Sequence, residues 1–138
     1  MIGPGSVIGI DTNILLRYLV QDDPVQSRKA AEVIERRPTK DNPGFVSLVC
    51  ILEIVWILGS LYKRTDAEIA DHIEMILAAD TFAVQNEQEI YQAVIALRSG
   101  AGTFEDALIG ALGTWWGCSA TLTFDQNAAK RLSGFQLL

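Results

Sequence analysis

The chain has 138 residues, of which 49% are hydrophobic and 20% are charged, and its formal net charge is −6. This length and composition predict one globular domain over residues 1–138 and exclude an intrinsically disordered chain. The sequence has neither the roughly 20 consecutive apolar residues of a membrane span nor the features of a signal peptide, so we expect a cytoplasmic protein without membrane contact. Its acidic balance argues against a passive nucleic-acid binder, which would carry a basic face.

The first half of the chain alternates between short β-branched runs and segments with helical periodicity. A strand is predicted at residues 6–10, followed by helices at 14–20 and 24–37, the second of which starts with proline at a first-turn position. A short strand at 45–47 then leads into the most apolar helix of the chain, which extends to residue 60.

The second half continues the same alternation. Helices are predicted at 65–79, 86–100, 103–117 and 125–132, and strands at 81–84, 119–124 and 135–138. The helix at 103–117 starts with the capping-box pattern of Thr103 and Asp106, which predicts Thr103 as its cap. Because strands and helices alternate without hairpin signals, we expect an α/β fold with a central parallel sheet of four or five short strands. Helices on both faces of that sheet would give three layers, α/β/α.

The cysteine and histidine content limits the possible chemistry. Cys50 and Cys118 lie far apart in apolar surroundings, which predicts two buried thiols and no disulfide framework or metal-ligand spacing. His72 is the only histidine and lies in a polar helical segment, so we expect it on the surface. Zinc sites built from cysteine and histidine are therefore excluded.

Three aspartates occupy comparable places in the predicted pattern. Asp11 and Asp125 directly follow predicted strands, and Asp106 lies in the first turn of a predicted helix. In open α/β sheets the ligand crevice lies beyond the carboxyl ends of the strands, where such helices begin. Each aspartate also has a structural interpretation, because acidic residues at helix starts cap the helix and interact well with its dipole.

Glu53 has no comparable structural explanation. It is the single charged residue between positions 47 and 60, and no basic residue follows it before Lys63. Glutamate is almost never fully buried unless it is compensated, so we expect Glu53 to be buried with a cation as its partner.

A divalent metal would explain the four acids together. Carboxylates gathered in one cleft raise one another's pKa unless a cation lies among them. All-oxygen sites suit Mg²⁺ or Mn²⁺, and such an ion can bind a phosphate oxygen and activate a water for phosphodiester hydrolysis.

Four segments, in this order, resemble a known family. They are VIGIDTNILLRYL (residues 7–19), Glu53 in its apolar helix, FEDALIGA (104–111), and LTFDQNAAKRL (122–132) followed by FQLL. Over nearly its whole length the chain resembles a PIN-domain ribonuclease of the VapC toxin type. The resemblance implies a PIN-like fold, RNA cleavage with Mg²⁺ or Mn²⁺, inhibition by a cognate antitoxin protein, and a homodimer.

The resemblance also assigns roles to individual residues. The catalytic, metal-binding acids would be Asp11, Glu53, Asp106 and Asp125, and the polar residues that support the site would be Asn13 and Thr123. Many relatives have a further acid three residues before the third of these acids, where this chain has Thr103; Glu105 stands beside Asp106 instead. The number of metal ions and the participation of Glu105 stay open.

Other classes fit the residues less well. A haloacid-dehalogenase-type phosphoacceptor needs a second aspartate where this chain has Asn13, and a receiver domain needs paired acids near the first strand. A dinucleotide-binding module needs its glycines after the first strand, whereas Gly3 and Gly5 precede it. Two alternatives stay open within the PIN fold: an RNA-processing nuclease outside a toxin–antitoxin pair, and an inactive binding or assembly protein.

Overall fold

The computed structural model describes residues 7–138, and its regular elements follow the predicted alternation. The helices are α1 (Thr12–Val20), α2 (Pro24–Arg36), α3 (Leu48–Ser60), α4 (Asp66–Ala78), α5 (Glu87–Ser99), α6 (Phe104–Trp116) and α7 (Gln126–Arg131). The strands are β1 (Gly44–Val46), β2 (Phe82–Val84), β3 (Thr121–Thr123) and β4 (Phe135–Leu137). None of these described helices combines the length and the apolar character that a bilayer span requires.

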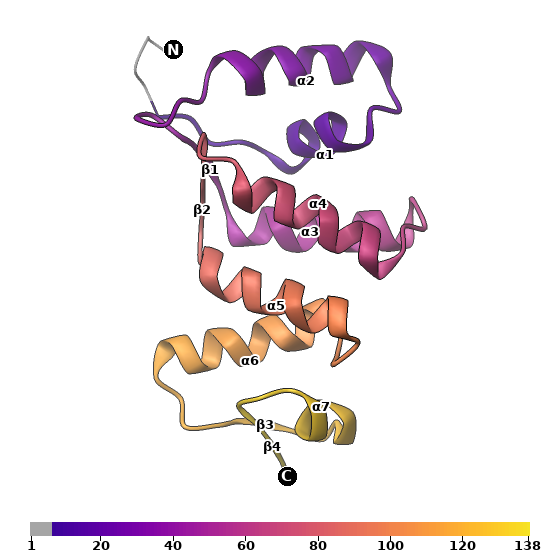
Figure 1. Cartoon of the computed structure of the whole chain (residues 1–138), viewed down its shortest axis with the longest axis vertical. Helices are drawn as coiled ribbons and strands as arrows, with labels where there is room; N and C mark the ends of the chain where they lie inside the picture. The colour runs from indigo at the N-terminus through magenta and orange to yellow at the C-terminus, as the bar shows by residue number, and fades with distance from the viewer. Residues whose placement is uncertain (1–6) are drawn as a thin grey trace. The chain divides into compact units, whose positions relative to one another are not determined.

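The elements form two compact units, each of which is described by itself. Unit 1 contains the chain up to residue 63 together with residues 75–85, and unit 2 contains residues 64–74 and 86–138. Unit 1 therefore carries α1, α2, α3, β1 and β2, while unit 2 carries α5, α6, β3, α7 and β4 (Figure 1). The helix α4 supplies residues to both units.

In unit 1, the predicted strand at 6–10 is a short segment beside β1. Its first residue lies outside the described part of the chain. The Phe45 N–H donates to the Ile8 carbonyl at 2.8 Å, and the Ile10 N–H donates to the Phe45 carbonyl at 2.9 Å. These bonds form one isolated parallel bridge, at Gly9. The predicted strand is thus present as a single bridge within the described residues.

The corner between α1 and α2 is fixed by two aspartates. Asp23 caps α2. Pro24 occupies the first position of this helix, as the sequence predicts. Asp22 joins the corner to the end of α3, since it accepts hydrogen bonds of 2.7 Å from the Tyr62 hydroxyl and from Arg17. The hydrogen bond from Tyr62 and the charge of Arg17 lower the pKa of Asp22.

In unit 2, α5 and α6 pack along each other through buried apolar side chains. Ile90 and Val94 of α5 and Phe104 and Leu108 of α6 are almost completely buried. Both helices end at glycines in the left-handed conformation, Gly100 and Gly117.

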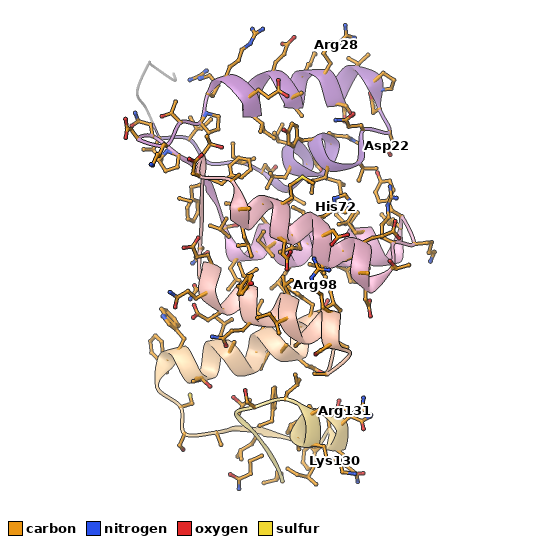
Figure 2. All side chains as sticks on the ribbon, in the orientation of Figure 1. Asp22, Arg28, His72, Arg98, Lys130 and Arg131 are labelled. Carbon is orange, nitrogen blue, oxygen red and sulfur yellow. The ribbon has the colours of Figure 1, made fainter. Side chains whose placement is uncertain are left out.

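An ion-pair cluster connects α5 to the part of α4 that belongs to unit 2. Arg98 of α5 contacts Asp71 at 2.7 Å and Glu74 at 3.0 Å (Figure 2). The hydrogen bonds to Glu74 and Asp71 raise the pKa of Arg98. The cluster joins α5 to this part of α4 at the surface of unit 2.

The sheet differs from its prediction. All described strands pair in parallel, as expected, but they form two two-stranded sheets, β1 with β2 and β3 with β4. The prediction of one central sheet of four or five strands is therefore wrong for residues 7–138. Each strand is only three residues long, and the segment that would have added a fifth strand makes a single bridge.

One of the two cysteine predictions is also wrong. Cys50 is buried on α3, as expected, but Cys118 is exposed. Cys118 directly follows Gly117, in the turn where the chain reverses after α6, so its apolar neighbours in sequence do not cover it. His72 is half-buried on α4.

The close contact of α6 with β4 gives a test of the fold. A Cβ on Gly110 would lie 2.6 Å from the ring of Phe135, so alanine cannot fit unless the ring moves. We expect Gly110→Ala to lower the free energy of unfolding by about 1–2 kcal/mol, as overpacking does, although alanine has the higher helix propensity by about 1 kcal/mol. Urea unfolding measures the change, and Phe135→Leu should recover most of it in the double variant. A single variant as stable as the wild type would contradict the contact.

Candidate active site

In unit 1, Asp11 lies where the bridged segment ends and α1 begins. It has an extended backbone conformation and is the N-cap of α1, with its Oδ1 accepting the Thr12 N–H at 2.8 Å. The Asp11 side chain is exposed. Asn13, in the first turn of α1, is exposed as well, and no described residue makes a hydrogen bond to its side chain. The capping contact leaves the second carboxylate oxygen of Asp11 free for a ligand.

Glu53, on α3, accepts a hydrogen bond from Thr12, the first residue of α1. The Thr12 hydroxyl donates to Glu53 Oε1 at 2.8 Å, across 41 positions of sequence. No described ion pair includes Glu53, so a basic partner does not explain it. The partner of Glu53 within unit 1 is a neutral hydroxyl group.

The predicted burial of Glu53 is wrong. The helix α3 buries one face, formed by Cys50, Ile51, Ile54, Val55 and Leu58. Glu53 lies off that face, on the side of the exposed residues Val49 and Trp56, and is itself exposed. The helix is apolar on both sides, so its composition did not reveal which positions it buries.

The pKa of the Cys50 thiol is raised above its ordinary value, and Asp11 and Glu53 are among the causes. Burial raises the pKa of Cys50 most, and a hydrogen bond with Thr12 lowers it. The charges of Asp11 and Glu53 raise the pKa of Cys50 further. The contacts that bring Asp11 and Glu53 together are the hydrogen bonds of Thr12, whose N–H donates to Asp11 and whose hydroxyl donates to Glu53.

In unit 2, Asp106 lies in the first turn of α6. Thr103 caps this helix, and its hydroxyl oxygen accepts the Asp106 N–H at 3.1 Å. The predicted capping role of Thr103 is therefore confirmed. Asp106 is half-buried, whereas its neighbour Glu105 is exposed.

Asp125 caps α7, directly after β3. Its Oδ1 accepts the N–H groups of Asn127 at 2.9 Å and Ala128 at 3.1 Å. Thr123 supports it, since the Thr123 hydroxyl oxygen accepts the Asp125 N–H at 3.0 Å. Thr123 and the first turn of α7 thus fix both the backbone and one carboxylate oxygen of Asp125.

The chain of unit 2 leads from Asp106 through α6 and β3 to Asp125. After α6 the chain turns back, and β3 runs alongside the helix (Figure 1). Gly113 approaches Thr121 so closely that a Cβ would lie 2.6 Å from the threonine hydroxyl oxygen. Asp106 is about 10 Å from Gly113 along α6, toward the start of the helix. Asp125 is about 13 Å from Thr121 along the strand direction, beyond the end of β3. From the contact of Gly113 with Thr121, the chain thus leads to Asp106 toward the start of α6 and to Asp125 beyond the end of β3.

The donor set suits a hard divalent cation. Among residues 7–138 no group of three or more histidine, cysteine, aspartate or glutamate side chains is close enough to hold an ion. Each unit by itself contains two of the four predicted acids, Asp11 and Glu53 in unit 1 and Asp106 and Asp125 in unit 2. Mg²⁺ keeps several of its waters and is bound through one or two carboxylates in many enzymes, so either pair offers part of such a site.

Comparison with known families decides the assignment. Residues 8–133 match the PIN domain. The chain belongs to the PIN domain family. PIN domains are generally nucleases, typically use divalent metals and act on nucleic acid. A search of curated proteins finds no match to this PIN domain.

Thr12 is the residue of this PIN domain that the sequence analysis missed. Asn13 and Thr123 were predicted to support the acids, and only Thr123 contacts one of them within the described residues. Thr12 lies between Asp11 and Asn13 in the DTN segment, and this position next to a predicted metal-binding acid could have indicated its role.

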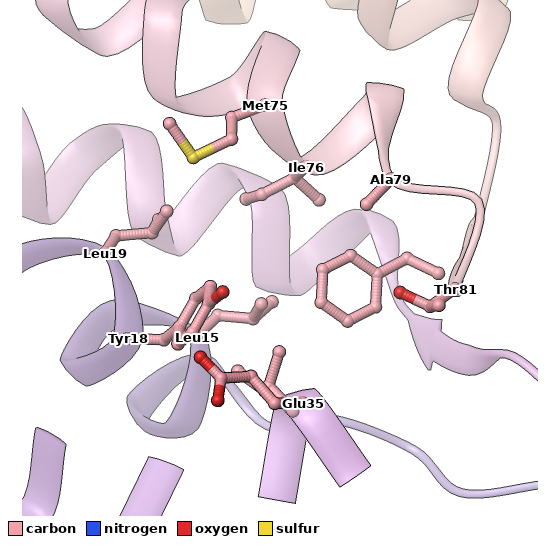
Figure 3. A pocket seen from close by; sticks show the side chains of 10 residues that line it. Leu15, Tyr18, Leu19, Glu35, Met75, Ile76, Ala79 and Thr81 are labelled. Carbon is pink, nitrogen blue, oxygen red and sulfur yellow. The ribbon is translucent and has the colours of Figure 1, made fainter. Parts of the chain in front are cut away.

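A cavity in unit 1 of the PIN domain is separate from the acids. It has a volume of about 280 Å³ and is lined by Leu15, Tyr18, Leu19, Ile34, Glu35, Met75, Ile76, Ala79, Thr81 and Phe82 (Figure 3). Its wall is mostly apolar, and Tyr18, Glu35 and Thr81 contribute polar groups (Figure 3). Neither Asp11 nor Glu53 lines it, so the cavity is not the candidate active site.

The caps allow the charge of Asp125 to be tested apart from its structural role. Asparagine is as good an N-cap as aspartate, so Asp125→Asn should change the free energy of unfolding by less than about 0.5 kcal/mol, whereas Asp125→Ala should cost about 1 kcal/mol. Both variants should lose nuclease activity, because both remove the carboxylate. Urea unfolding and RNA cleavage are measured on the same samples.

Asp23 provides the matched control, because it caps α2 through two N–H groups in the same way as Asp125 caps α7. Asp23→Ala should lose a similar amount of stability and keep its activity. Full activity of Asp125→Asn would show that Asp125 acts only as a cap.

Proposed function

We propose that the chain is a Mg²⁺- or Mn²⁺-dependent endoribonuclease. Its metal-binding, catalytic residues would be Asp11, Glu53, Asp106 and Asp125, held by a single PIN domain over residues 1–138. The observation that carries the proposal is the contact of Thr12 with Glu53, in a chain of the PIN family. The contact joins two acids 42 positions apart in sequence at the start of α1.

The described hydrogen bonds support this proposal for the individual acids. Each contact uses one oxygen of Asp11, Glu53 or Asp125, and leaves the other oxygen of that carboxylate for a cation. Asp106 has its backbone fixed by Thr103 and its carboxylate unused by any described hydrogen bond. Carboxylates whose orientation is already fixed lose less conformational entropy when they bind an ion.

The chemistry then follows from the residue types. When bound, a divalent ion polarises a phosphate oxygen and lowers the pKa of a water, which supplies the nucleophile for hydrolysis. The four carboxylates would hold the ion and orient it toward the scissile phosphate, and none of them needs to act as a covalent nucleophile. Lys130 and Arg131, on α7 after Asp125, offer positive charge for the RNA backbone (Figure 2).

We further propose that the protein is the toxin of a VapBC-type pair, active as a homodimer in the cytoplasm and inhibited by a cognate antitoxin protein. Support for this finer assignment comes from the order and spacing of the segments that contain Asp11, Glu53, Asp106 and Asp125. The PIN family match supports the nuclease class.

The nuclease proposal predicts metal-dependent cleavage of RNA. Purified protein should cleave single-stranded or looped RNA with Mg²⁺ or Mn²⁺ and stop in EDTA, and Zn²⁺ should replace these ions poorly because the site offers no nitrogen or sulfur ligand. Asp11→Asn, Glu53→Gln, Asp106→Asn and Asp125→Asn should each reduce cleavage by at least a hundredfold while the circular dichroism spectrum is unchanged. Cleavage that survives exhaustive chelation would contradict this mechanism.

The toxin proposal predicts an effect on growth. Expression of the wild type in a bacterial host should slow growth, and Asp11→Asn, expressed at the same level, should not. Co-expression of the neighbouring gene product should relieve the effect. An active nuclease that leaves growth unchanged would sink the toxin assignment and favour an RNA-processing enzyme.

A further inference from the structure

Thr12 makes hydrogen bonds to both predicted metal-binding acids of unit 1, Asp11 and Glu53. Its backbone N–H donates to Asp11 Oδ1 at 2.8 Å, and its hydroxyl donates to Glu53 Oε1 at 2.8 Å. Thr12 itself is only 6% exposed, whereas the two acids that it contacts are exposed. A fixed residue thus holds two side chains that would otherwise move freely in solvent.

We propose that Thr12 is a positioning residue that sets the geometry of the metal site through Glu53. This inference rests on the proposed function, since it gives Thr12 a role toward the ion that Asp11 and Glu53 would bind. Thr12 does not contact the ion in this proposal. It acts by directing one oxygen of each carboxylate, so that the other oxygen faces the ion.

The chemistry of the side chains favours this role. Threonine is branched at Cβ and has few rotamers, so a buried threonine presents its hydroxyl in a fixed direction. Glutamate has three rotatable bonds, and at an exposed helix position it samples many rotamers. The short hydrogen bond to Thr12 selects those rotamers of Glu53 that point toward the start of α1 and Asp11.

A purely structural role for Thr12 has a different signature. A buried hydroxyl needs a partner, and Glu53 could serve only to satisfy it. In that case removal of the hydroxyl would affect stability and leave metal affinity unchanged. Hydrogen-bond partners of metal ligands, in contrast, change metal affinity by about 10–100-fold when they are removed.

The test uses three variants of the full chain. Thr12→Val keeps the shape and removes the hydroxyl, Thr12→Ser keeps the hydroxyl, and Ser27→Ala removes a buried hydroxyl of unit 1 that has no hydrogen-bond partner among the described residues. Mn²⁺ and Mg²⁺ affinities are measured by isothermal titration calorimetry without RNA, and the metal dependence of RNA cleavage is measured in parallel.

We expect Thr12→Val to weaken metal affinity by about tenfold or more. Thr12→Ser should stay within about twofold of the wild type, and Ser27→Ala should match it. In a Glu53→Gln background Thr12→Val should have little further effect on metal affinity, because the route through Glu53 is already lost.

The outcomes separate this inference from the proposed function. A wild type that binds neither ion and cleaves no RNA would overturn the nuclease proposal. A wild type that binds metal and cleaves RNA, together with unchanged affinity in Thr12→Val, would overturn the role of Thr12 alone. If Thr12→Val fails to fold, Thr12→Ala replaces it, and unchanged metal affinity in Thr12→Ala would overturn the inference. A tenfold loss of metal affinity in Thr12→Ser would overturn it as well.

Discussion

The two hydrogen bonds between residues 8–10 and Phe45 are the constraint on which the acids of unit 1 depend. They place the segment before Asp11 parallel to β1, so that both segments have their carboxyl ends at the same edge of unit 1. Both then enter helices at once: α1 begins at Thr12, and α3 begins at Leu48, two residues after β1. Glu53 comes a turn and a half into α3, within reach of the Thr12 hydroxyl, so the backbone pairing determines which side chains can meet.

Helix capping and metal binding are compatible roles for the same aspartates. Asp11 and Asp125 were open to interpretation as ordinary caps, and both do cap helices. A cap needs only one carboxylate oxygen, and it fixes the carboxylate at a helix start. The helix dipole also favours negative charge at that end of the helix. Capping therefore prepares an aspartate for a cation and does not compete with it.

The sequence predicted those features that depend on local pattern. The alternation of strands and helices, the parallel pairing, Pro24 at the start of α2 and the cap at Thr103 all follow from residues close in sequence. The number of strands in a sheet depends on partners that are distant in sequence, so the reduction of the first strand to a single bridge could not be predicted from local pattern. The exposure of Glu53 and Cys118 was missed because apolar neighbours in sequence do not cover a side chain that points away from the core.

In the proposed metal site, a hydroxyl at position 12 would suit the partner of Glu53 better than a basic side chain would. An arginine or lysine beside Glu53 would hold the carboxylate in place but would neutralise its charge, and would repel a divalent cation. A threonine hydroxyl orients the carboxylate and leaves its full negative charge for the ion. No described ion pair includes Glu53, so within unit 1 its exposed carboxylate has no basic partner. In the proposed metal site, the geometry of Glu53 would thus be set by a neutral donor, and its charge would be left for the metal.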